Sequence, residues 1–443
     1  MPEEVKPGNR TTITELVVKI HFVFLPAIPV LHPGPLAAIL ERNSLHLPAP
    51  LMARPRKSVT PRLAPRKSPA CPLLYAASDT NADQYYFGRF FAPDAFLALG
   101  PRGKRVAVMP TLEYGRALKE STYDTVLRLD EWQKRARETF HREDAGLAHV
   151  VKLLAREYEV SRFIVPAEFP SGMLMKLRAL QIPVEVSDGP LFPEREIKDK
   201  EEAALIREGC DACAAGLWAA EKALRRSTAK RNGELVLEGK ALTSESLRFL
   251  VDVACMENGA IAQNTIVAGG QQACDPHCRG SGPLRASDLI IVDVFPRVMD
   301  SGYYGDMTRT FLKGRATEPQ RALVDAVRRA QKIAIKKLGP GVTGKKVHQS
   351  VQKYFTKLGY ETRHKATFVE GFFHGTGHGL GLDIHEPPRV NLTGPRLHKG
   401  TVVTVEPGLY YPGLGGCRIE DVVQITDDGC KLLSDYDYNW ELP

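Results

Sequence analysis

Residues 374–388, HGTGHGLGLDIHEPP, concentrate side chains that can bind a metal ion or move a proton. This stretch holds three histidines (His374, His378 and His385), two carboxylates and four glycines. Each glycine would cost a helix about 1 kcal/mol relative to alanine, and glycine lets the backbone approach a ligand closely. We therefore expect an extended strand, in which His374 and His378 point to the same face because side chains alternate along a strand.

Two other interpretations of this stretch agree less well with its sequence. A dinucleotide-binding turn requires the pattern G-x-G-x-x-G, but Leu380 stands where the third glycine is needed. The histidines could instead be ordinary polar residues of a loop. A cluster of three histidines within twelve residues favours a functional role over that explanation.

Four carboxylates elsewhere in the chain interrupt apolar or β-branched runs. Asp293 follows LIIV, Asp306 lies in YYGDMTRTF, Glu406 lies in VVTVEPG and Glu420 lies in CRIEDVVQI. A buried charge in a strand is unfavourable unless it is paired or bound to an ion. Together with one histidine, four carboxylates suit a pair of hard or borderline divalent cations better than a single structural zinc.

The order and spacing of these residues resemble those of a known family. Asp293, GDMTRTF, HGTGHGLGLDIHE, VEPGLYY and RIEDVV are similar to motifs of the metallopeptidases that include methionine aminopeptidase, aminopeptidase P and prolidase. The resemblance implies an α+β pita-bread catalytic domain that binds two divalent metal ions, with manganese expected first and cobalt or zinc as alternatives. The implied ligands are Asp293, Asp306, His378, Glu406 and Glu420, with Asp306 and Glu420 bridging the two ions.

The resemblance also implies roles for the side chains around the ions. Glu406 would relay the proton of the attacking water, and His277, in DPHCRG, and His385 would stabilise the tetrahedral intermediate. His374 would line the substrate pocket, and Arg418 would steady the neighbouring bridging carboxylate. The implied catalytic set is Glu406, His277, His385 and His374, and the implied substrate-binding set is His277, His374, His385 and Arg418.

One spacing departs from the family pattern. Asp293 and Asp306 are thirteen positions apart, two more than is usual in the family. If these aspartates lie on the two arms of a hairpin, an even insertion keeps both side chains on one face, whereas an odd insertion would turn Asp306 away. Asp300 lies inside the connecting loop and is the alternative ligand, but it lacks the TRT sequence that follows Asp306.

The substrate implied by the resemblance is a peptide with proline in the second position. Prolidase, aminopeptidase P and creatinase have a separate N-terminal α/β domain, which bacterial methionine aminopeptidase lacks. We therefore expect hydrolysis of an Xaa-Pro bond, and both a dipeptidase and an aminopeptidase fit the sequence. The alternatives are methionine-aminopeptidase-like activity and a non-catalytic pita-bread binding module. The resemblance further implies a homodimer located in the cytoplasm.

Length and composition indicate a soluble globular protein with more than one domain. A chain of 443 residues is long for one hydrophobic core, and its 43% hydrophobic and 25% charged residues are ordinary values. The net charge of +8 is concentrated in residues 1–67, which carry +6, so the remaining chain gives no indication of nucleic acid binding. We expect a tail at residues 1–69, a creatinase-like α/β domain at 70–190 and the catalytic domain at 191–443.

The N-terminal residues do not match a membrane span or a signal peptide. Lysine, histidine and four prolines interrupt the apolar run at residues 19–40, so it lacks the roughly 18 clean positions that a span needs. Met52 opens a basic, proline-rich segment that we expect to be disordered. We hypothesise that Met52 is the true start of the protein.

The cysteines and the remaining patterns predict ordinary structural elements. Eight scattered cysteines favour reduced thiols, and Cys210 and Cys213 have helical spacing without a second pair, so they favour a helix core over a zinc or redox site. Before residue 190, β-rich runs alternate with helical runs, which is typical of an α/β domain with a largely parallel sheet. After a boundary near residues 187–202 we expect a long helix that ends at about Ala229, and further helices at 244–259, 317–339 and 343–359. We expect strands at 264–270, 288–298, 303–314, 401–411 and 417–426.

Overall fold

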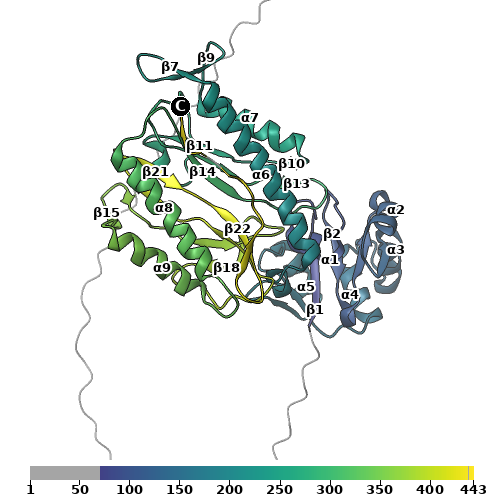
Figure 1. The fold of residues 1–443 in the computed structure, drawn as a ribbon. Helices are drawn as coiled ribbons and strands as arrows, with labels where there is room; N and C mark the ends of the chain where they lie inside the picture. The colour runs from purple at the N-terminus through teal and green to yellow at the C-terminus, as the bar shows by residue number, and fades with distance from the viewer. Residues whose placement is uncertain (1–69, 438) are drawn as a thin grey trace, which may run out of the picture. The chain divides into compact units, whose positions relative to one another are not determined.

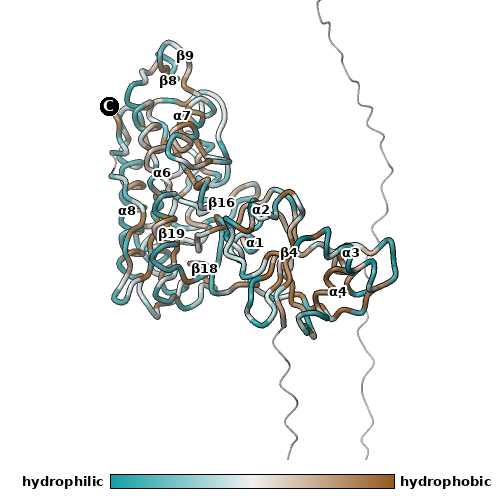
Figure 2. Tube along the Cα trace, turned by 90° about the vertical axis from the view of Figure 1, so that its right-hand side faces the viewer, coloured by the Kyte–Doolittle hydropathy of each residue, from teal (hydrophilic) through white to brown (hydrophobic). Residues whose placement is uncertain are grey.

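The computed structural model describes residues 70–437 and 439–443, and Figure 1 shows its fold. The hypothetical start at Met52 and the expected tail at residues 1–69 lie outside the described residues. Within the described part, no helix combines the length and the hydrophobicity that crossing a membrane requires. Figure 2 shows the chain coloured by hydropathy, with hydrophobic residues in brown.

The N-terminal α/β region is built on a six-stranded sheet with the order β4-β3-β2-β1-β5-β6. The pairs β3/β4, β1/β5 and β5/β6 are parallel, as expected, whereas β2 runs antiparallel to both neighbours. The six residues between β2 and β3 are too few for the crossover that a parallel pair needs. The strands are β1 (Cys71–Ala76), β2 (Phe96–Leu99), β3 (Val106–Met109), β4 (Thr125–Arg128), β5 (Phe163–Val165) and β6 (Val184–Val186). The helices are α1 (Ala82–Gly88), α2 (Thr111–Glu120), α3 (Leu129–Phe140), α4 (Leu147–Glu157) and α5 (Ser171–Ala179).

The C-terminal region combines two pairs of helices with two larger sheets, among the residues that the structure describes. Helix α6 packs against α7, β12 and β14, and α8 packs against α9, β19 and β21. The sheets have the orders β11-β12-β14-β24 and β18-β17-β19-β22-β23. The helices are α6 (Lys200–Arg226), α7 (Ser244–Glu257), α8 (Glu318–Lys337) and α9 (Gly344–Lys357). The strands are β11 (Ile266–Gly269), β12 (Ile290–Val294), β14 (Met307–Lys313), β17 (Gly377–Gly379), β18 (Glu386–Val390), β19 (Val402–Val405), β22 (Asp421–Ile425), β23 (Cys430–Leu432) and β24 (Glu441–Leu442).

Short strands and turns of 3-10 helix connect these elements. The hairpin of β20 and β21 joins β19 to β22, and its last residue, Arg418, lines a cavity. The short strands are β7 (Thr228–Ala229), β8 (Leu235–Leu237), β9 (Lys240–Ala241), β10 (Ala260–Ile261), β13 (Arg297–Val298), β15 (Arg363–His364), β16 (Val369–Glu370), β20 (Gly408–Tyr411) and β21 (Gly415–Arg418). The 3-10 turns are η1 (Pro101–Gly103), η2 (Pro193–Glu196) and η3 (Gln272–Cys274).

The helix expected at residues 317–339 begins at a capping residue. Thr317 caps α8, since its side chain accepts a hydrogen bond from the backbone amide of Gln320. Helix α6 ends at Arg226, slightly before the expected end at residue 229, because β7 begins at Thr228. Both cysteines of the C-x-x-C pair are buried on α6 as free thiols, in agreement with a role in the helix core.

The register of β12 and β14 keeps the two aspartates on one face. Asp293 lies opposite Thr308 in the antiparallel pair. Val292 and Val294 belong to the core beneath α6 and α7, so the alternation of a strand turns Asp293 to the opposite face. Asp306 precedes Thr308 by two positions and therefore shares the face of Asp293. The two extra residues therefore leave both aspartates on one face, as expected from the sequence.

The histidine-rich stretch is not the single continuous strand that we expected. Gly377–Gly379 forms β17, residues 386–388 belong to β18, and a series of bends at residues 381–385 separates the two strands. The pairing of β17 with β18 shifts after His378, since two prolines in β18 cannot donate to the ladder. His374 lies outside the strand, so the expected alternation does not explain its direction.

The approach of α6 to the turn before Asp306 leaves no room for a side chain. A Cβ on Gly209 would lie within 2.4 Å of the Gly305 backbone nitrogen, whereas a Cβ on Gly115, in the exposed α2, would contact nothing within 4 Å. We expect Gly209→Ala to lower the free energy of unfolding by about 1–3 kcal/mol through overpacking. The control Gly115→Ala should raise it by about 0.5–1 kcal/mol through helix propensity. Urea denaturation of both variants measures the contrast, and equal effects would contradict the close contact.

Candidate metal centre

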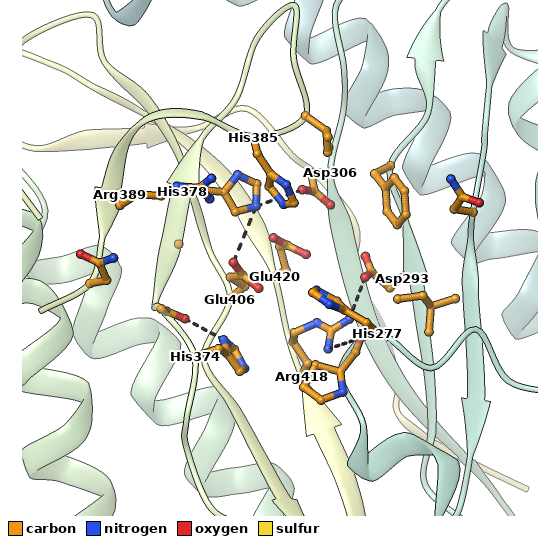
Figure 3. Close-up of a pocket in the computed structure, with 18 of the residues that line it drawn as sticks. His277, Asp293, Asp306, His374, His378, His385, Arg389, Glu406, Arg418 and Glu420 are labelled. Atoms are coloured by element: carbon orange, nitrogen blue, oxygen red, sulfur yellow. Dashed lines mark hydrogen bonds and ion pairs between the residues drawn. The ribbon is translucent and has the colours of Figure 1, made fainter. Parts of the chain in front are cut away.

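A cavity of about 740 Å³ lies against the inner faces of the C-terminal strands. Figure 3 shows side chains from both larger sheets converging on it. Every side chain to which the sequence assigned a role lines this cavity: His277, Asp293, Asp306, His374, His378, His385, Glu406, Arg418 and Glu420. Residues that are more than a hundred positions apart therefore share one enclosed space.

Each predicted ligand stands in a strand or directly beside one, where backbone hydrogen bonds fix its direction. Asp293 is in β12 and His378 is in β17. Asp306 precedes β14, Glu406 follows β19, and Glu420 lies between β21 and β22. The amides of Glu406 and Glu420 donate to backbone carbonyls at 2.8 and 3.0 Å, so these positions are tied down although they lie outside the strands.

The imidazole of His378 is arranged to present a lone pair to the neighbouring carboxylates. Its Nδ1 lies 3.0 Å from the Gly379 carbonyl, which can only accept, so Nδ1 carries the proton. Burial, with the nearby His385, lowers the pKa of His378 to about 3, so the ring is neutral. The unprotonated Nε2 lies 3.6 Å from both Asp306 Oδ2 and Glu406 Oε1. A lone pair facing two carboxylate oxygens is repulsive unless a cation lies between them.

The carboxylates of the cavity also repel one another. Burial, reinforced by Glu420, holds the pKa values of Asp306 and Glu406 well above their usual range. Burial and the charge of Asp293 raise the pKa of Glu420 to about 7. These pKa values apply to the cavity without an ion. A bound cation would lower the pKa values, because it stabilises the ionised carboxylates.

These residues fit divalent cations. Ligand atoms of Asp306, His378 and Glu420 all lie within 4.8 Å of one another. Within the described residues, the buried Oδ1 of Asp293 has no hydrogen-bond partner, although a buried carboxylate oxygen normally has one. Hard carboxylate oxygens combined with one imidazole are a donor set that suits manganese, iron, cobalt or zinc.

The position of Arg418 corrects one expectation. Its guanidinium lies 2.7 Å from Asp293 Oδ2 rather than beside the carboxylate of Glu420. Its hydrogen-bonded link to Glu420 runs through Thr308, whose hydroxyl accepts from Arg418 Nε at 3.3 Å and donates to Glu420 Oε2 at 2.7 Å. The reason is the strand register, because Thr308 stands between the two side chains and fills the hydrogen-bonding position that we assigned to Arg418. The charge of Arg418 also opposes the rise in the pKa of Glu420.

His374 is held by hydrogen bonds at both ring nitrogens. Nδ1 donates to the Gly375 carbonyl at 2.7 Å, so Nε2 accepts from the hydroxyl of Tyr410 at 2.9 Å. The Tyr410 oxygen also accepts from Arg418 at 3.1 Å. Burial, with Arg418 nearby, lowers the pKa of His374 to about 3, so the chain from His374 to Asp293 operates with a neutral imidazole.

His277 and His385 face the open part of the cavity. His277 lies on the loop after η3, where its backbone amide donates to Asp275 at 3.1 Å. The ring of His385 stands perpendicular to that of His378, with 4.4 Å between the ring centroids (Figure 3). Burial and the charge of Arg389 lower the pKa of His385, which favours a neutral ring with one proton to donate.

Sequence reasoning missed several side chains of the cavity. Arg389 and Asn391, from β18 and just beyond it, line the cavity, and Tyr410 connects His374 to Arg418. Strand alternation after the His385 motif could have pointed to Arg389 and Asn391. The alternative ligand Asp300 is exposed in the turn after β13 and does not line the cavity.

Comparison with known proteins identifies relatives of the whole C-terminal region. Residues 204–427 match the profile of metallopeptidase family M24. The Xaa-Pro dipeptidase of Pyrococcus furiosus is 34% identical over 244 residues, which cover 54% of this chain and 63% of that protein. A putative dipeptidase of Bacillus subtilis is 30% identical over 246 residues, covering 55% of this chain and 61% of that protein. The matches thus span less than two thirds of the length of these relatives.

Solved structures with the same fold cover most of the chain. The prolidase from Pyrococcus furiosus superposes with a TM-score of 0.67 at 24% identity, covering 83% of this chain and 97% of that one. The X-Pro aminopeptidase from Thermotoga maritima gives a TM-score of 0.70 at 21% identity, covering 84% and 97%. The expected fold, an N-terminal α/β region followed by a pita-bread catalytic region, is confirmed.

The carboxylate repulsion predicts that a divalent cation stabilises the protein, and more so at higher pH. A carboxyl group whose pKa is raised in the folded state contributes stability at low pH that is lost as the pH rises through that pKa. For Glu420 the raised pKa is about 7. We therefore expect the Tm increase on adding Mn²⁺ to metal-free protein to be larger at about pH 8 than at about pH 6.

Histidine variants test whether this stabilisation arises in the cavity. We expect His378→Ala to lose most of the Mn²⁺-dependent Tm increase, because it removes a neutral ligand from the cluster. The control His364→Ala changes an exposed histidine of β15 and should keep the full increase. Scanning calorimetry with and without Mn²⁺ measures both, and an undiminished shift in His378→Ala would contradict the proposed location.

Proposed function

Because the chain belongs to metallopeptidase family M24, we propose that it is a peptidase that hydrolyses Xaa-Pro bonds with two divalent cations. Membership of this family implies that a divalent metal is bound. The observation that carries the proposal is the convergence of four carboxylates and a neutral imidazole in one cavity. Similarity to an Xaa-Pro dipeptidase and to an X-Pro aminopeptidase supports the proline preference.

Charge balance supports two cations rather than one. If a metal holds all four carboxylates in their ionised form, Arg418 is the buried cation beside them and compensates one of the four charges, while Arg389 lies at the exposed side of the cavity. A single divalent ion would leave a net negative charge in a buried site, which is unfavourable. Asp293, Asp306, His378, Glu406 and Glu420 would hold the pair, and Asp306 and Glu420 would bridge it. We propose manganese as the metal, since oxygen donors outnumber the single nitrogen.

The side chains of the cavity have distinct tasks in the proposed reaction. Two divalent cations, when bound, would lower the pKa of a shared water and polarise the scissile carbonyl. Glu406, whose side chain is 18% exposed on the cavity side, takes up the proton that the attacking water loses. His277 and His385 donate hydrogen bonds to the oxygen that becomes negative in the tetrahedral intermediate. His374 orients Tyr410 and Arg418 through its fixed tautomer.

The wall of the cavity supports a substrate with an apolar ring. Ile266, Phe295, Phe373 and Ile384 line it beside the polar cluster. Such a wall suits the pyrrolidine ring of proline. The proline nitrogen at the scissile bond carries no proton, so it needs no hydrogen-bond acceptor from the protein. Binding sites of this kind combine an apolar lining with a few placed polar groups.

Arg389 supports a preference for dipeptides. Within the described residues its guanidinium makes no ion pair and no hydrogen bond, although it lies in a cavity rich in carboxylates. Arg389 stands opposite His378, a proposed metal ligand, in the pair of neighbouring strands β17 and β18. A guanidinium in that position matches the carboxylate of a dipeptide, whose C-terminus lies one residue from the scissile carbonyl. We propose that Arg389 binds this carboxylate.

The organisation of the whole protein is part of the same proposal. We propose that residues 70–190 and 191–443 form separate domains, which is supported by a first sheet made only of strands β1 to β6. We further propose a cytoplasmic homodimer. Light scattering coupled to size-exclusion chromatography tests the homodimer.

Hydrolysis of short peptides tests the proposed activity. With Mn²⁺ we expect cleavage of Ala-Pro and slower cleavage of Ala-Pro-Ala. We expect Glu406→Gln to reduce kcat by about 10²–10⁴-fold, because the proton acceptor is lost. The control Glu157→Gln changes an exposed residue of α4 and should keep wild-type rates. Release of methionine from Met-Ala-Ser without cleavage of Ala-Pro would favour a methionine-specific enzyme, and no cleavage of any peptide would favour a binding module.

Substitution of Arg389 tests the preference for dipeptides. We expect Arg389→Met to raise KM for Ala-Pro by about 10–10²-fold, the value of a hydrogen bond to a charged group. KM for Ala-Pro-Ala should change much less, because its carboxylate lies one residue further away. The control Arg396→Met alters an exposed arginine outside the cavity. Equal losses for both peptides in Arg389→Met would refute a role in carboxylate binding.

A further inference from the structure

We propose that Glu386 is a positioning residue, whose buried carboxylate holds the loop at residues 380–385 so that His385 faces the cavity. Its kinetic consequence rests on the proposed peptidase activity. Glu386 is absent from the lining of the cavity and from the metal cluster. It therefore acts through a neighbour and not on the substrate.

The carboxylate of Glu386 forms a buried ion-pair network. Oε2 lies 2.8 Å from Lys198 Nζ, and Oε1 lies 2.5 Å from Arg195 Nη2. The side chains of Lys198 and Glu386 are only 2% and 4% exposed. Burial acts to raise the pKa of Glu386, but Lys198 and Arg195 outweigh it and the pKa lies below its usual value. A buried ion pair of this kind contributes little net stability but can select one conformation over others.

The loop that precedes Glu386 is fastened around this carboxylate. Glu386 pairs with Gly379 across the base of the loop. Its Oε1 accepts a hydrogen bond from the Asp383 amide at 3.1 Å. A Cβ on Gly381 would lie 2.8 Å from both carboxylate oxygens, so the loop backbone packs directly on the charged group. The amide of Tyr304 also donates to the Gly381 carbonyl at 2.9 Å, which fixes the far side of the loop.

His385 depends on this loop for its position. In the part of the chain that the structure describes, its imidazole makes no hydrogen bond, and its ring contact is the perpendicular packing on His378 at 4.4 Å. The backbone must therefore set the direction of the ring. Figure 3 shows His385 between His378 and Asp306, above Glu406 and Glu420. A rotation of the loop would remove His385 from this position. Misplacement of a reacting group by about 1 Å can cost about 10²-fold in rate.

Arg195 connects the same network to the N-terminal α/β region. Its guanidinium lies 2.6 Å from Asp83 Oδ1 in α1 and 2.8 Å from Asp383 Oδ2 in the loop. One arginine thus bonds to the loop, to the carboxylate beneath it and to α1. The segment before α6, which carries Arg195 and Lys198, therefore holds the loop beside the cavity through ion pairs with Asp383 and Glu386.

Hydrogen exchange and a double-mutant cycle test the role of Glu386. Glu386→Gln keeps the size of the side chain and an acceptor for the Asp383 amide but removes the charge. We expect amide exchange of residues 380–385 in metal-free protein to accelerate by about tenfold. With Mn²⁺ we expect kcat for Ala-Pro to fall by about 10²-fold and KM to change little. In a His385→Ala background, Glu386→Gln should have no further effect on kcat, since both changes remove the same interaction.

Two further variants complete the experiment. Glu441→Gln removes the partner of Arg321 at 2.6 Å, far from the loop, and should leave exchange at residues 380–385 and kcat unchanged. If Glu386→Gln alone does not fold, the double variant Glu386→Gln with Lys198→Met is used in its place, because it removes the buried charge of both residues.

The outcomes separate this inference from the proposed activity. Unchanged exchange of the loop in Glu386→Gln would overturn the inference, and so would independent, multiplicative losses of kcat in the Glu386 and His385 variants. A wild-type protein that hydrolyses no peptide would refute the peptidase proposal, while exchange of the loop would still decide whether Glu386 holds it.

Discussion

Repulsion among buried negative charges is the constraint on which the rest of this structure depends. Asp306, Glu406 and Glu420 each have a pKa above the usual value because burial and their neighbours oppose ionisation. His378 adds a lone pair directed at two of these groups. A fold can maintain such a cluster only if protons or cations neutralise it and if the surrounding strands are rigid enough to hold the groups together. Both conditions shape the C-terminal region.

The strands, and the elements that pack against them, hold the acidic side chains in place. Asp293 is held by Arg418, and Glu420 by Thr308, so two of the four acids have a fixed partner before any ion is considered. Gly209 allows α6 to touch the turn that presents Asp306, and this contact ties a ligand to the longest helix among the described residues. These supports leave the ligand atoms pointing inward at short range, which is the preorganisation that a metal site requires.

The other part of the cavity is organised by loops, and in the proposed function its side chains serve the substrate rather than the ions. His385 takes its direction from a loop that surrounds the carboxylate of Glu386. Arg389 follows three positions later on β18 and faces the cavity without a partner within the described residues. Residues before α6 hold this loop by ion pairs. In the proposed function, reaction type and substrate length therefore depend on different elements, since strands hold the candidate ligands while β18 and its loop place the groups that would contact the peptide.

The sequence by itself determined the types and the order of the candidate ligands. It also determined the shared face of Asp293 and Asp306, because alternation along a hairpin depends only on whether a spacing is odd or even. It also indicated the helix starts, since capping is local. Only the tertiary structure decided that Arg418 meets Asp293 instead of Glu420, that the stretch around His378 breaks into two strands, and that Arg389 faces the cavity. These outcomes depend on the register between strands that are far apart in the chain and on loop closure, and no local pattern encodes which distant side chain fills a given hydrogen-bonding position.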